Sequence, residues 1–171
     1  IIIGGVGNTD LYGVRIEGCT LNGPGASSAG TAGIVLGTAT GSVDGLVSGC
    51  KIADCDRGIQ YGAFQRTRIV ETTIMDVATG IRSKGSANDN LAVSNCIIVL
   101  DDTDGLEGIA IDSTSDIKVL GTDISNPRTT FTATPQGIAV AAKSGVDTNL
   151  IVQGCHIKGF WDSVGNVGAG L

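Results

Sequence analysis

A six-residue motif recurs six times along the chain and limits its possible folds more than any other feature. The motif reads apolar, any, Gly or Asn, Cys or Thr, any, apolar, and residues 47–52 (Val-Ser-Gly-Cys-Lys-Ile) show it in full. The other copies begin at residues 16, 69, 93, 119 and 152, and Glu71 is the one departure from Gly or Asn. Such self-similarity predicts a repeat protein in which each copy is a unit stacked on the next.

The residues between the motifs indicate strands rather than helices. Gly-Ile pairs begin at residues 33, 58, 80, 108 and 137, and short alternating segments such as 108–111 (Gly-Ile-Ala-Ile) follow them. Short alternation broken by Gly, Asn, Ser and Asp is typical of strands and turns, and no stretch shows a helical period. Gly or Asn in the motif tolerates the left-handed backbone of a bend. We therefore expect an all-β, parallel β-helix solenoid of about five to six coils over residues 1–171.

Composition and charge exclude several classes of partner. The chain has 27 glycines and few aromatic residues among 171, as expected for many tight turns around a narrow core of small aliphatic side chains. Its net charge is −6, which opposes non-specific binding to nucleic acid or to an anionic membrane. No apolar run is long enough for a spanning helix, so we predict no membrane insertion.

The ends of the chain suggest a segment of a longer protein. Residues 1–4 (Ile-Ile-Ile-Gly) match residues 34–37 in register, so the chain begins within a coil and without Met or a signal peptide. The last residues are rich in Gly and contain no capping helix, whereas solenoids need caps at their ends.

Gly-Ile strands followed by Val-x-Asn/Gly-Cys-x-Ile resemble the right-handed parallel β-helices of the pectate lyase superfamily and of phage tailspike and tail-fibre proteins. This resemblance implies a right-handed solenoid and, as the leading function, a virion structural and host-glycan-binding module. It also implies a homotrimer on the virion surface, assembled in the host cytoplasm, with a host surface polysaccharide as its partner. A secreted or cell-surface location is the alternative.

Two other functions stay open because one scaffold carries many activities. The chain could be a polysaccharide lyase or glycoside hydrolase that acts on a surface glycan. It could also be a purely structural repeat shaft.

Four of the five cysteines occupy the same motif position, at residues 19, 50, 96 and 155. We expect them to stack inside the solenoid with Thr72 and Thr122, since free Cys behaves as a small apolar residue. Adjacent coils are slightly too far apart for a disulfide, and the free thiols suggest assembly in a reducing compartment. No CxxC pair marks a zinc site. Cys55 lies outside this column, so we predict that it is the most reactive.

Four acids are candidate catalytic residues. Asp54 and Asp76 both follow the last motif residue by two positions, at the same corner of successive coils, and Asp101 and Asp102 fall near that corner one coil later. Carboxylates one or two coils apart would lie about 5 or 10 Å from each other, which brackets the separations in glycosidases. The cluster could also bind Ca²⁺, as the resembling pectate lyases do, and no other cofactor is predicted. Solvated turns are the alternative.

A second group of residues is the candidate glycan-binding site. Arg recognises carboxylates in a planar, bidentate geometry, and an aromatic ring with one wet side can stack on a sugar. The candidates are Tyr61, Phe64, Arg66, Arg82 and Lys84, with Arg68 nearby and Trp161 further along the chain. An ordinary mixed surface is the alternative.

His156 is the only histidine, and it lies between the inward residues Cys155 and Ile157. Asp123 occupies the same motif position one coil earlier. We expect these two side chains to form a surface ion pair.

Overall fold

The computed structural model describes residues 1–3, 11–37, 42–83, 90–103, 105–114, 116–128, 135–142 and 149–160. Within them, the chain forms strands β1 to β17, and every pairing between strands is parallel. No helix in these ranges is long and apolar enough to cross a membrane.

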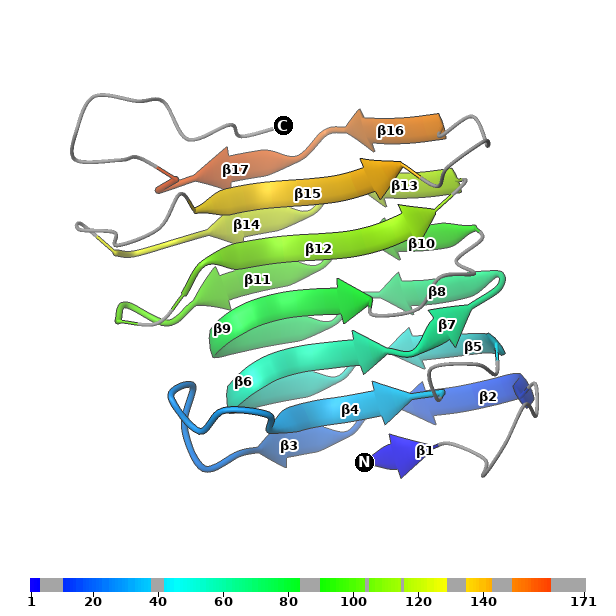
Figure 1. Ribbon diagram of the computed structural model, residues 1–171, viewed down its shortest axis with the longest axis horizontal. Helices are drawn as coiled ribbons and strands as arrows, with labels where there is room; N and C mark the ends of the chain where they lie inside the picture. Colours follow the sequence, from blue (N-terminus) through cyan, green and yellow to red (C-terminus); the bar gives the residue numbers. More distant parts are fainter. Residues whose placement is uncertain are drawn as a thin grey trace.

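One sheet lies toward the right of Figure 1, mostly behind the front strands, and is called the back sheet below. Its strands are β2 (Leu11–Glu17), β5 (Ser42–Ser48), β7 (Ala63–Phe64), β8 (Thr67–Val70), β10 (Leu91–Ser94), β13 (Asp116–Leu120) and β16 (Asn149–Gln153). All but β7 follow one another in sequence order across the sheet, one strand per coil. This order arises because each coil of the chain lies directly on the previous one.

A second sheet bends around the other two sides of each coil. Its short strands are β3 (Thr20–Asn22), β11 (Ile97–Leu100), β14 (Asp123–Ser125) and β17 (His156–Lys158). Its Gly-Ile strands are β1 (Ile2–Ile3), β4 (Ala32–Leu36), β12 (Glu107–Thr114) and β15 (Gln136–Ala142). The long strands β6 (Lys51–Tyr61) and β9 (Thr73–Ser83) pass through the corner and belong to both sides.

The Gly-Ile strands lie side by side at the front of Figure 1, and their outward surface is called the front face below. The coils stack from the N-terminal to the C-terminal end of the chain, with six successive strands in the back sheet. The parallel β-helix predicted from the repeat is thus confirmed. The predicted register of the first residues is also confirmed, since Ile2 pairs with Val35 and Ile3 with Leu36.

The repeated apolar positions form columns along the core. The isoleucines of the Gly-Ile pairs align in register and are buried: Ile34, Ile59, Ile81, Ile109 and Ile138. The last motif residues form a second column: Leu21, Ile52, Ile74, Ile98, Ile124 and Ile157. Burial of these ladders supplies the apolar contact that holds one coil against the next.

The predicted column of Cys and Thr residues is confirmed. Cys50, Cys96, Thr72 and Thr122 are buried, and all five cysteines are free. Each side chain donates to the carbonyl two residues earlier, at 3.3 Å from Cys96 Sγ to Ser94 O and 3.1 Å from Thr72 Oγ1 to Val70 O. Thr and Cys therefore fill the same motif position and donate to the same kind of backbone carbonyl.

The prediction that Cys55 is the most reactive thiol is wrong. Its side chain is only 2% exposed, and its Sγ donates to the carbonyl of Ala53 at 3.2 Å. Burial raises the pKa of this thiol, so the reactive thiolate is disfavoured. The corner in β6 turns Cys55 inward. Because Cys55 lies outside the motif column, the repeat does not reveal this inward orientation.

Left-handed backbone marks the bend in every motif. The third motif residue has φ between +50° and +64° in all six copies: Gly18, Gly49, Glu71, Asn95, Gly121 and Gly154. A second left-handed position lies at the next corner, where Asp54 and Asp76 have φ of +57° and +54°. Asp is among the few residues that adopt this conformation routinely, which explains its presence at a corner.

Candidate functional site

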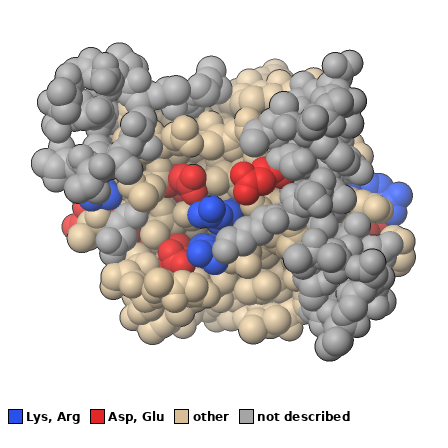
Figure 2. Space-filling view, in the orientation of Figure 1, with Lys and Arg blue, Asp and Glu red and all other residues tan. Residues whose placement is uncertain are grey.

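Charged side chains gather over the middle of the front face (Figure 2). We call the following set the front cluster: Asp56, Arg57, Gln60, Arg82, Glu107 and Asp112. The register of the Gly-Ile strands produces it, because Arg57 and Glu107 occupy the position before the Gly-Ile pair and Gln60 and Arg82 the position after it. Side chains from β6, β9 and β12 thereby point outward together.

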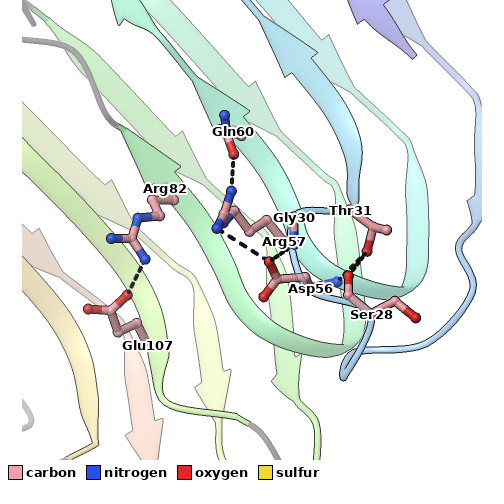
Figure 3. Close-up of polar contacts among 8 residues, drawn as sticks. All are labelled: Ser28, Gly30, Thr31, Asp56, Arg57, Gln60, Arg82 and Glu107. Atoms are coloured by element: carbon pink, nitrogen blue, oxygen red, sulfur yellow. Dashed lines mark hydrogen bonds and ion pairs between the residues drawn. The ribbon is translucent and has the colours of Figure 1, made fainter.

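Asp56 joins the front cluster to the loop between β3 and β4 (Figure 3). Its carboxylate Oδ2 accepts a hydrogen bond from the backbone N–H of Gly30 at 2.7 Å and lies 3.3 Å from Arg57 Nη2. Its own N–H donates to Thr31 Oγ1 at 3.0 Å, and that hydroxyl donates to the carbonyl of Ser28 at 2.8 Å. The carboxylate therefore holds the loop against the front face.

Two arginines are fixed in different ways on this face (Figure 3). Arg57 Nη1 donates to Gln60 Oε1 at 2.6 Å, and the Arg57 side chain is only 17% exposed. Arg82 Nη1 lies 3.5 Å from Glu107 Oε2, with the two side chains 34% and 29% exposed. Arg82 Nε is buried and has no hydrogen-bond partner among the described residues, so one donor of this guanidinium is unsatisfied.

A cavity of about 430 Å³ adjoins the front cluster on β12 and β15. Glu107, Asp112 and Gln136 supply its polar lining. The remaining lining is apolar and comes from Ala110, Ile111, Ile138, Ala139 and Val140. A concave surface that combines apolar side chains with a few polar groups is the usual form of a small-molecule site.

The structure brings together two of the four predicted catalytic acids. Asp54 lies opposite Asp76, because Ala53 pairs with Met75 and Cys55 with Val77. Both side chains are exposed at the outer corner, and neither makes a hydrogen bond or ion pair among the described residues. Neither lines the cavity on the front face.

Asp101 and Asp102 lie in the turn after β11 rather than at the corner of Asp54 and Asp76. A register shift between Val99 and Leu100 leaves no residue opposite Asp76, so Asp101 falls further along the coil. Asp101 Oδ1 accepts from the Thr103 N–H at 2.7 Å, and Asp102 Oδ1 accepts from Thr103 Oγ1 at 3.0 Å. Such local bonds are typical of Asp in a turn.

The described residues contain no group of three or more His, Cys, Asp or Glu side chains that could hold a metal ion. Asp104, two residues after Asp102, lies outside the described residues.

The predicted glycan-binding residues do not form one patch, and Tyr61 is the clearest correction. Its side chain is fully buried, in the inward column with Leu36 and Ser83. It therefore cannot stack on a sugar. The inward position follows from the Gly-Ile alignment, since Tyr61 is three residues after Gly58 as Leu36 is after Gly33.

The remaining members of that prediction separate onto different sides of the coil. Arg66 precedes β8 on the back sheet and binds Asp44 at 2.7 Å, whereas Arg82 belongs to the front cluster. The chain turns the corner between Tyr61 and Thr67, which separates the two arginines in space. The Phe64 side chain lies outside the described part of the structure, as do Lys84 and Trp161.

His156 and Asp123 pair in register, as predicted. Both side chains are exposed, but no ion pair within 4.0 Å joins these two described residues. The predicted surface ion pair is therefore wrong, because adjacent positions on a sheet do not by themselves orient two exposed side chains toward each other.

Sequence reasoning missed most of the front cluster. The predicted site residues include none of Asp56, Arg57, Gln60, Glu107, Asp112 and Gln136. Aligning the chain on its Gly-Ile pairs would have revealed the column of Ala32, Arg57, Thr79, Glu107 and Gln136 that crosses the front face.

A family model described as "Right handed beta helix region" matches residues 1–170. The chain therefore belongs to this family of right-handed parallel β-helices, which establishes the handedness of the coils. Comparisons with curated proteins and with solved structures found no match.

Proposed function

We propose that this chain is a saccharide-binding β-helix module whose binding surface is the front face. The observation that carries the proposal is the cavity of about 430 Å³ beside the front cluster, edged by Glu107, Asp112 and Gln136. The β-helix family is compatible with this role, and also with structural and with lyase or hydrolase roles.

The lining of the cavity suits a sugar. The small and apolar residues Ala110, Ala139 and Val140 offer a surface for the C–H groups of a pyranose ring. The carboxylates accept hydrogen bonds from sugar hydroxyls, and the amide of Gln136 both donates and accepts. Arg82, whose side chain is 34% exposed and lies beside Glu107, adds further donors next to this edge.

The carboxylates favour binding over hydrolysis. Glu107 and Asp112 are five residues apart on β12, so their Cα atoms lie about 16 Å apart along the strand. The separation of about 5–5.5 Å between carboxyl groups that a retaining glycosidase needs is out of reach for a pair with this Cα spacing. Asp56 is occupied by Gly30 and Arg57, which gives it a structural task.

A glycan array first identifies polysaccharides that bind the protein. Calorimetric titration with these polysaccharides then tests the proposal. We expect Gln136→Ala to weaken binding about three- to tenfold, the effect of one hydrogen bond. Gln153→Ala, on the back sheet, is the matched control and should bind like the wild type. Equal affinities of both variants and the wild type would overturn the front face as the site. Depolymerisation of the bound glycan, lost in Asp76→Asn or Asp102→Asn, would instead establish an enzyme.

We also propose that the module acts within a phage tailspike or tail fibre, as a homotrimer at the virion surface that contacts a host polysaccharide. The resemblance of its Gly-Ile and Val-x-Asn/Gly-Cys-x-Ile segments supports this proposal. Native mass spectrometry of the protein tests it: a trimer is expected, and a monomer would overturn the trimeric assembly.

A further inference from the structure

We propose that a groove on the back sheet is a separate binding site for an acidic oligosaccharide, held between Arg68 and Lys118. The basic groove consists of Arg66, Arg68, Asn90, Ala92, Asp116 and Lys118. It lies on the opposite side of the coil from the front cluster. The proposal rests on the proposed function only in taking the ligand to be a saccharide.

The register of three strands places the two cations on either side of a methyl group. Arg68 on β8 pairs with Ala92 on β10, which pairs with Lys118 on β13. Adjacent strands lie about 4.8 Å apart, so the two backbone positions are about 9.6 Å apart. Because Ala92 is small, the space between the long side chains stays open as a cavity of about 330 Å³.

Arg68 and Lys118 differ from the other basic residues of this sheet in having no ionic partner. Both are exposed, and neither forms an ion pair with a described residue. Arg15, in contrast, pairs with Glu17 at 3.0 Å, and Arg66 pairs with Asp44 at 2.7 Å. Once Arg66 is paired with Asp44, two cations and the single carboxylate of Asp116 face this cavity, so its charge stays positive and attracts an anion, although the whole chain carries a charge of −6.

The rest of the groove fits a saccharide rather than an isolated ion. Asn90 and Asp116 precede the aligned residues Leu91 and Ile117, so they lie next to each other along one edge. An amide and a carboxylate can bind sugar hydroxyls, while the Ala92 methyl group forms an apolar floor. The guanidinium of Arg68 matches a carboxylate or sulfate in two parallel hydrogen bonds, and Lys118 acts as a point charge.

The groove also has the extent that a chain-like ligand needs. A second cavity of about 220 Å³ is lined by Arg15, Asp44, Leu46 and neighbouring residues, and it shares Arg66 and Arg68 with the first. The two cavities follow each other across the strands from β2 to β13, along the direction in which the coils stack. Nucleic acid is disfavoured because two free cations on an acidic chain release few counterions.

Titration with oligosaccharides of equal length tests the inference. The probes are a sulfated, a uronate-containing and a neutral oligosaccharide, each at low and at high salt. We expect the acidic probes to bind more tightly than the neutral one, with an advantage that shrinks at high salt. Arg68→Ala and Lys118→Ala should each weaken binding of the acidic probes about tenfold or more, as expected for a lost charged hydrogen bond.

Controls separate this site from non-specific attraction and from the front face. Lys158→Ala removes an exposed cation on β17 and should leave acidic binding unchanged. The loss caused by Arg68→Ala should be equally large in the background of Gln136→Ala, which alters only the front face. The inference is overturned if Arg68→Ala and Lys118→Ala leave binding of the acidic probes unchanged, if Lys158→Ala matches the loss in Lys118→Ala, or if only Gln136→Ala weakens the acidic probes. In the last case the front face remains the saccharide site, and the basic groove is not a binding site.

Discussion

The side chain of Ile98 lies directly over Gly80, so closely that a Cβ atom on Gly80 would come within 2.5 Å of Ile98 Cγ2. The same Cβ would also collide with the carbonyl oxygen of Gly108 in the next coil. Gly58 has the same relationship to Ile74 and to Gly80. The glycines of the Gly-Ile pairs are therefore required by the close approach of neighbouring coils at the corner.

We expect Gly80→Ala to destabilise the protein. Gly→Ala in an open, compatible position stabilises by about 0.4–1 kcal/mol through the unfolded chain. Here the added methyl group must displace both a side chain and a backbone carbonyl, which costs about 1–3 kcal/mol as overpacking. Urea denaturation of the variant and the wild type measures the change, and equal stability would show that the coils can separate without cost.

Glu71→Gly should stabilise the protein. Glu71 adopts φ of +50° at the motif bend where the other copies have Gly or Asn. A left-handed conformation costs an ordinary residue about 1–2 kcal/mol, and glycine avoids this cost at some expense in chain entropy. A rise in the thermal midpoint is expected for Glu71→Gly but not for Glu71→Ala, which keeps the strain. Similar midpoints for both variants would assign any effect to loss of charge.

Cys96→Thr should be nearly neutral, because Thr72 and Thr122 already fill the same column and bond to the same kind of carbonyl. Cys96→Leu should cost about 1–3 kcal/mol, since the larger side chain overfills a buried position. Chemical denaturation distinguishes the two variants. Comparable losses in both would indicate that the thiol has a role that a hydroxyl cannot replace.

The stability of the fold should decline at alkaline pH. Burial raises the pKa of the Cys50, Cys55 and Cys96 thiols above their ordinary value of 9.0, and burial likewise raises the pKa of Tyr61 above 10.0. The unfolded chain loses these protons first, so the stabilisation is complete below about pH 9 and is lost as pH rises through the folded-state values. Urea denaturation between pH 7 and 11 measures this slope. Cys96→Thr should reduce it, and an unchanged slope in that variant would contradict the contribution of Cys96.

Asp56→Ala should release the loop between β3 and β4. The change removes the 2.7 Å bond from Gly30 and the contact with Arg57, which are worth about 1–3 kcal/mol as charge-assisted interactions. Hydrogen exchange at Gly30 and Thr31 should accelerate, whereas Asp123→Ala, at an exposed site on β14, should leave it unchanged. Unaltered exchange in Asp56→Ala would mean that Thr31 alone holds the loop.

The fold was predictable because its determinants are local and recur. Three features act within single coils: period-two alternation, Gly or Asn at the bend, and one apolar residue at each inward position. The motif alone therefore predicts strands, bends and core columns. The columns that include Cys50, Cys96, Thr72 and Thr122 follow once the coils stack in register. The net charge of −6 also argued against non-specific binding to nucleic acid.

Only the tertiary structure decided which outward side chains meet. The turn after Tyr61 separates Arg66 from Arg82, and the register shift at Leu100 moves Asp101 away from Asp76. Such turns and bulges differ from coil to coil, so the repeat does not determine them. The contact of Arg82 with Glu107 and the open space between Arg68 and Lys118 depend on register across three coils. The sequence by itself determined the solenoid and its core, whereas the stacking of non-identical coils determined the sites on its surface.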